Sequence, residues 1–91
     1  MLSTTVTVSN RLGLHARAAA QLVKLVSSFE SKVILTRADV DSSADARSIL
    51  SLLNLAAVSG TVLNIEAVGE DEESTLAAVQ RLFESGFNET T

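Results

Sequence analysis

The apolar residues of this 91-residue chain change their spacing several times, from every second residue to every third or fourth and back. Alternation with β-branched residues indicates a half-buried strand, and the wider spacing indicates an amphipathic helix. These patterns predict four strands, at residues 5–9, 31–37, 40–44 and 61–68. They also predict three helices, which cover residues 16–28, about ten residues from near Ala46, and a segment from the acidic run 70–73 to Gly86.

The predicted order of elements is βαββαβα, in one domain over residues 1–91. Mixed strands and helices with short connections predict an α+β fold, in which helices cover one face of a single sheet. The segment 40–44 is short and polar, so we expect it at an edge of the sheet. Asp45 is expected to cap the second helix, and Ser59-Gly60 to break it.

The composition excludes several kinds of chemistry. Without Cys the chain has no disulfide, zinc thiolate, iron–sulfur cluster or thiol nucleophile, and with one His it has no multi-His metal site. We therefore expect no metal and no cofactor. A net charge of −4 and only three aromatic residues argue against a nucleic-acid partner. No apolar run could span a membrane and no signal peptide is evident, which predicts a cytoplasmic protein without membrane insertion.

The charge is unevenly distributed along the chain. Residues 1–47 hold 6 basic and 4 acidic residues, a charge of +2, whereas residues 48–91 hold 1 basic and 7 acidic residues, a charge of −6. The mildly basic first half could meet an acidic partner.

The single His lies in Gly13-Leu14-His15-Ala16-Arg17, just before the first predicted helix. The first amides of a helix lack helical partners and its dipole is positive there, so this position suits an anion, and Arg17 adds a donor for phosphate. A neutral imidazole can attack phosphorus and hold the phosphoryl group without a metal. From these residues alone, an ordinary surface or capping His is the more common interpretation.

A second candidate is Ser48, which we expect in the first turn of the second helix. A phosphate there would be favoured by the helix N-terminus and opposed by the nearby Asp45, and from these residues alone an ordinary first-turn serine is the more common interpretation. The residues that follow are more apolar than a short surface helix needs, which predicts an exposed patch around Ile49 to Leu53. A small binding or regulatory module that uses this patch without phosphorylation is therefore an alternative function.

The segment from Gly13 to Arg17 closely resembles the active-site segment of the HPr family, the histidine-containing phosphocarriers of the bacterial phosphotransferase system. The resemblance covers nearly the whole chain, and further matching residues are Ala19-Ala20, Leu22-Val23-Lys24, Arg47-Ser48-Ile49, Gly60-Thr61 and Gly69-Glu70-Asp71-Glu72. It implies an open-faced sandwich, with a four-stranded antiparallel sheet and three helices on one face.

The resemblance also implies a function. His15 would accept a phosphoryl group at Nδ1 from the phosphohistidine of enzyme I and pass it to a His of an enzyme IIA protein, with Arg17 assisting. Such a protein is a carrier that needs partner enzymes, not an enzyme itself, and we expect a monomer. Ser48 matches the regulatory serine that an ATP-dependent serine kinase phosphorylates in some bacteria.

The family's docking surface would come from the first helix and the start of the second. The matching residues here are Ala16, Arg17, Ala20, Lys24, Ile49, Leu50 and Leu53. A weak and transient contact is expected, since a carrier must release each partner.

The chain departs from the family pattern at three places. Ala18 stands where the family usually has Pro, Arg47 replaces the common Lys, and the stretch between Thr36 and Ser48 is slightly longer than usual. Ala retains helix propensity, so we expect the first helix to form. The family has a sugar-uptake branch and a nitrogen-regulatory branch that share the His motif. We assign the chain to the sugar branch because that branch is the more common.

Overall fold

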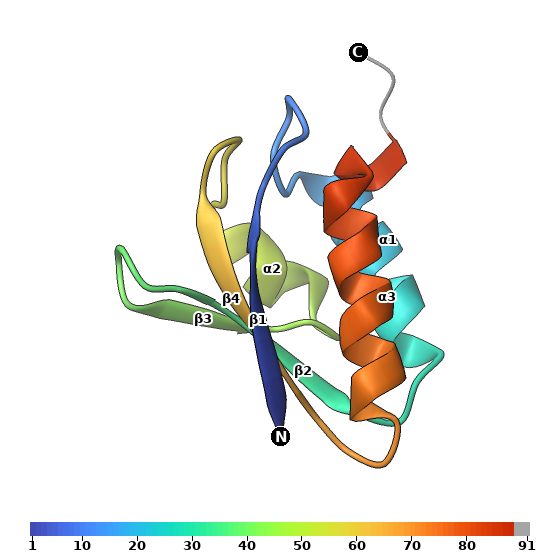
Figure 1. The fold of residues 1–91 in the computed structure, drawn as a ribbon. Coiled ribbons are helices and arrows are strands. Elements are labelled where there is room, and N and C mark those ends of the chain that lie inside the picture. Colours follow the sequence, from blue (N-terminus) through green and yellow to red (C-terminus); the bar gives the residue numbers. More distant parts are fainter. Residues whose placement is uncertain (89–91) are drawn as a thin grey trace.

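Four antiparallel strands form one sheet, and three helices cover one of its faces (Figure 1). The computed structural model describes residues 1–88. The sheet has the order β1-β4-β2-β3, and its strands are β1 (Leu2–Thr7), β2 (Lys32–Arg37), β3 (Ser42–Asp45) and β4 (Val62–Val68). The helices are α1 (Ala16–Ser27), α2 (Ile49–Asn54) and α3 (Glu72–Glu84), and a short 3-10 helix, η1 (Gly86–Asn88), follows α3. The predicted α+β fold class is therefore confirmed.

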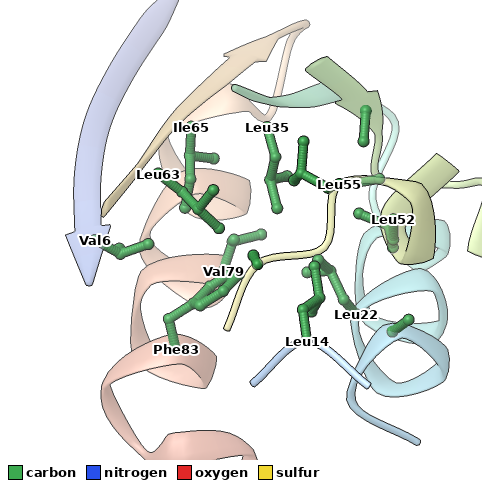
Figure 2. Close-up of a cluster of buried hydrophobic side chains, with 14 of the residues drawn as sticks. Val6, Leu14, Leu22, Leu35, Leu52, Leu55, Leu63, Ile65, Val79 and Phe83 are labelled. Carbon is green, nitrogen blue, oxygen red and sulfur yellow. The ribbon is translucent and has the colours of Figure 1, made fainter. Parts of the chain in front are cut away.

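The sheet is amphipathic because its side chains alternate between the two faces. On the covered face Val6 of β1 lies opposite Leu63 of β4, and Leu35 of β2 lies opposite Ile65 of β4. These four side chains are buried, and they point toward the helices (Figure 2). The alternation that predicted strands thus marks the residues that form the sheet side of the core.

The helices contribute the other side of the core. Leu22 of α1, Leu52 of α2, and Val79 and Phe83 of α3 are fully buried in one apolar cluster (Figure 2). Phe83 meets Phe87 of η1 edge to face, with ring centroids 4.9 Å apart. Such aromatic pairs add to the stabilisation that burial alone provides.

β1 and β3 differ most from their predicted limits, whereas β2 and β4 each start only one residue later than predicted. β1 covers Leu2–Thr7 instead of residues 5–9, because its register with β4 starts at the pair Leu2 and Ala67. β3 covers Ser42–Asp45 instead of residues 40–44, and it is an edge strand as expected. Register depends on the partner strand, which local spacing does not reveal.

The largest local difference is α2, which has six residues instead of about ten. Asp45 does not cap it: one carboxylate oxygen of Asp45 accepts from the amide of Arg47, and its carbonyl accepts from the amide of Ser48. Residues 45–48 therefore turn, and Ser48 becomes the N-cap. The helix ends at Asn54, well before Gly60.

The acidic run 70–73 spans the start of α3, and Asp71, its N-cap, has a structural role that the sequence did not indicate. The carboxylate of Asp71 accepts hydrogen bonds from the amides of Glu30 and Ser31, both at 2.9 Å, and from the hydroxyls of Ser31 and Thr75. Ser31 and Thr75 are fully buried. Asp71 thus ties the turn between α1 and β2 to the start of α3.

These hydrogen bonds, chiefly that from the Ser31 hydroxyl and then that from the Glu30 amide, lower the pKa of Asp71 to about 2. Because this value lies below the ordinary unfolded-state pKa of about 4, the ionised carboxylate stabilises the fold above about pH 4. The contribution is lost as the pH falls from about 4 to about 2.

We expect Asp71→Asn to lower the melting temperature by several degrees at pH 7, and the difference from the wild-type protein to close by pH 2. Thermal unfolding followed by circular dichroism across this pH range measures it. Glu73→Gln, which removes an exposed acid from the same helix, serves as the control and should change little. A difference that stays constant from pH 7 to pH 2 would contradict the role assigned to the Asp71 carboxylate.

Candidate functional site

His15 is the residue that begins α1. It occupies the N-cap position with an extended backbone, at φ −80° and ψ −179°, and its carbonyl accepts the first helical hydrogen bond from the amide of Ala19 at 2.8 Å. The residue is partly exposed, and the first turn of α1 contains no acidic residue. The first amides of α1 and the positive end of its dipole therefore favour an anion at this helix start, which His15 occupies.

The loop that carries His15 is anchored by backbone and side-chain contacts. The amide of Leu14 donates to the carbonyl of Ala57 at 2.8 Å, and the side chain of Leu14 enters the core (Figure 2). The side-chain amide of Asn10 donates to the carbonyl of Gly13 at 2.7 Å. The loop before α1 also lies beside the loop before β4 (Figure 1), where Val8 exchanges backbone hydrogen bonds with residues 60 and 61. His15 thus starts its helix from a fixed point.

Gly13 is required for this contact. It has φ +68°, and a Cβ atom there would lie 2.6 Å from the carbonyl oxygen of Ala57 and 2.9 Å from Cα of Val58. Both are backbone atoms, so the two loops would have to separate.

We expect Gly13→Ala to destabilise the protein by about 1–3 kcal/mol, the range for a strained backbone position. Gly60→Ala is the matched control, because Gly60 also has a positive φ, +91°, but a Cβ there would meet no atom within 4 Å. Denaturant unfolding should show a clearly larger loss for Gly13→Ala. Equal losses would mean that the close approach to Ala57 contributes nothing.

The other predicted site residues of α1 and α2 lie on the surface. Arg17, Ala16, Ala20 and Lys24 are exposed on α1, and Ile49, Leu50 and Leu53 are exposed on α2. The two helices pack against each other. The exposed apolar patch predicted for the second helix is therefore present, and its use for docking stays a prediction.

Ala18 lies inside α1 and is fully buried. The family that the sequence resembles usually has Pro at this position. The helix forms with Ala there, as expected from its propensity.

Ser48 is the N-cap of α2 and not a residue of its first turn, which corrects the sequence-based placement. Its hydroxyl oxygen accepts a hydrogen bond from the amide of Ser51 at 3.2 Å, and the residue is partly buried. Phosphorylation of Ser48 by a serine kinase stays a prediction, which a kinase assay on the purified protein would test.

Two arginines near the helices make backbone hydrogen bonds that were not predicted from the sequence. Arg37 donates from Nη1 to the carbonyls of Leu55, at 3.1 Å, and Ala56, at 2.9 Å, just after α2. Arg47 donates from Nη2 to the carbonyl of Phe29, just after α1, at 2.7 Å. A cation is favourable at a helix C-terminus, but these arginines come from distant segments, so helix spacing gave no signal.

Two other kinds of feature are absent from residues 1–88. They contain no group of three or more His, Cys, Asp or Glu residues arranged to hold a metal ion. No helix among them is long and apolar enough to cross a bilayer.

Comparison with known proteins identifies the family of the chain. The family model described as PTS HPr component phosphorylation site matches residues 2–85. The chain belongs to the HPr family. It is thus a phosphocarrier of the phosphotransferase system, and a carrier rather than an enzyme.

Relatives of two kinds are similar to the chain. A phosphocarrier protein HPr of Xylella fastidiosa is 44% identical over 91 residues, which cover all of both chains. A phosphocarrier protein NPr of Escherichia coli K12 is 45% identical over 85 residues, 93% of each chain. Among solved structures, HPr of Thermoanaerobacter tengcongensis superposes with a TM-score of 0.92 at 34% identity, over all of both chains. The open-faced fold implied by the sequence resemblance is confirmed.

Proposed function

We propose that His15 is the residue that carries the phosphoryl group, accepting it from the phosphohistidine of enzyme I and passing it to a His of an enzyme IIA protein. The observation that carries the proposal is the position of this single His, at the N-cap of α1 ahead of a first turn without acids. Exposed Arg17 follows two residues later and supplies a positive charge at the same helix end.

The chemistry follows from this position. The lone pair of the neutral Nδ1 atom attacks phosphorus, and the P–N bond to the donor's imidazole breaks as the new P–N bond forms. The amides at the start of α1 and the guanidinium of Arg17 stabilise the charge on the phosphoryl oxygens. No base on this chain is needed, because the neutral ring nitrogen is already a nucleophile.

The docking face that we propose consists of the exposed residues Ala16, Arg17, Ala20, Lys24, Ile49, Leu50 and Leu53 on the packed helices α1 and α2. Its apolar residues would lose contact with water on binding, and Arg17 and Lys24 would face an acidic partner. We propose that the protein acts as a monomer in the cytoplasm, where a small carrier can exchange partners rapidly.

Within the phosphotransferase system we propose the sugar-uptake branch. The nitrogen-regulatory branch is a second candidate, because the Escherichia coli relative named NPr matches as well as the Xylella relative named HPr. The donor that phosphorylates the chain faster decides between them.

Incubation with phosphoenolpyruvate and enzyme I should place one acid-labile phosphate on each wild-type chain and none on His15→Ala. Intact-protein mass spectrometry measures both, with circular dichroism as the control for folding. The assay uses a sugar-type and a nitrogen-type enzyme I in parallel, each checked with its own carrier. A wild-type chain that stays unlabelled with both, or a labelled His15→Ala, would refute the proposal.

Leu50→Ser should raise the KM of enzyme I for the carrier about fivefold, which corresponds to ~1 kcal/mol of lost contact. Leu50 is 75% exposed, so stability should change little. Val40→Ser is the matched control, because Val40 is 57% exposed in the turn between β2 and β3, outside the docking face. Equal KM values for the two variants would place docking elsewhere.

A further inference from the structure

We propose that Arg37 is a positioning residue for phosphoryl transfer: it holds the backbone after α2, and that backbone in turn holds the loop that carries His15. The inference rests on the proposed role of His15 and extends it to a residue at the far end of strand β2. Arg37 is not a catalytic residue, since the connection runs through backbone contacts.

The guanidinium of Arg37 is fixed from two sides. Asp39 binds it with both carboxylate oxygens, one to Nε at 3.1 Å and the other to Nη2 at 2.8 Å. This leaves Nη1 directed at the carbonyls of Leu55 and Ala56, at 3.1 and 2.9 Å. A planar fork that is oriented by a carboxylate can hold two carbonyls at once, which a single hydrogen bond could not.

The backbone that Arg37 holds is in an uncommon conformation. Ala56 has φ +52°, in the left-handed region that residues with a Cβ atom rarely adopt. Such a conformation costs free energy and persists only where surrounding contacts impose it. The two hydrogen bonds from Arg37 reach the residue itself and the one before it. They are thus placed to impose this turn at the end of α2.

The next residue along this backbone contacts the loop that carries His15. Ala57 is buried, and its carbonyl accepts the amide of Leu14 at 2.8 Å. Gly13 also fits against Ala57 and Val58 with no room for a Cβ atom. If Ala56 relaxes to a more common conformation, the carbonyl of Ala57 moves, and the start of α1 loses its fixed point. His15 follows Leu14 directly, so its ring would lose its alignment with the transferring phosphoryl group.

Arg37→Gln tests the proposal through two measurements, the exchange rate of the Leu14 amide and the turnover number. A purely structural role would not change both. Hydrogen exchange should show the Leu14 amide exchanging faster than global unfolding accounts for. The turnover number of enzyme I with the variant as substrate should fall about tenfold while KM stays near the wild-type value, because the docking face is untouched. Arg37→Lys keeps a cation but not the fork to Asp39, and it should recover part of both.

Two matched variants separate this effect from general ones. Arg81→Gln makes the same charge change at an exposed residue of α3. Arg47→Gln removes a comparable arginine–carbonyl hydrogen bond at the other end of α1. It should lower global stability while the Leu14 amide exchanges no faster than global unfolding allows. Asp39→Asn weakens the orientation of Arg37 without removing it, so it provides the test if Arg37→Gln does not fold.

The outcomes are distinct. If the wild-type protein is labelled and the folded Arg37→Gln variant has an unchanged turnover number, the role of Arg37 is overturned. The proposed role of His15 then still stands. The same holds if Leu14 exchange in Arg37→Gln follows global stability, as in Arg47→Gln. A wild-type protein that takes no phosphate on His15 overturns the proposed function, and with it this role.

Discussion

The hydrogen bond between the amide of Leu14 and the carbonyl of Ala57 is the contact on which the arrangement of the site depends. It joins two loops that lie far apart in the sequence, one before α1 and one after α2. Gly13 makes the approach possible because it has no Cβ atom. His15 can begin a helix at a defined place only because the residue before it is held on both its side chain, in the core, and its backbone.

Some basic residues of the first half of the chain have a structural role at the helix ends. The positive charge of this half suggested an acidic partner, but Arg37 and Arg47 donate to backbone carbonyls near the ends of α2 and α1. Arg17 and Lys24 stay exposed on α1 and belong to the docking face that we propose. The acidic second half divides similarly: Asp71 binds the turn before β2, whereas Glu73 stays exposed.

The short helix α2 contributes both to the core and to the exposed apolar surface. One face places Leu52 in the core, and the other leaves Leu50 exposed. Six residues are too few for such a helix to be stable by itself, so its ends need help. Ser48 caps the start through the amide of Ser51, and Arg37 holds the carbonyls at the end. The helix that carries this exposed apolar surface is therefore stabilised by contacts at its two ends.

The sequence by itself determined the order of strands and helices, because their spacing is a local property. It offered His15 as one candidate, but from the residues alone an ordinary surface or capping His was the more common interpretation. The resemblance around Gly13 to Arg17 supplied the family and its four-stranded antiparallel sheet with three helices on one face, and the structure added the strand order. The tertiary structure alone decided the length of α2, the left-handed turn at Ala56 and the partners of Arg37 and Asp71. The turn at Ala56 and the distant partners of Arg37 and Asp71 depend on contacts between residues about 20 to 40 positions apart, such as Arg37 with Ala56 and Ser31 with Asp71. The start of α2 instead follows from the hydrogen bonds that Asp45 accepts from Arg47 and Ser48. Local spacing carries no record of which distant backbone group a side chain will reach.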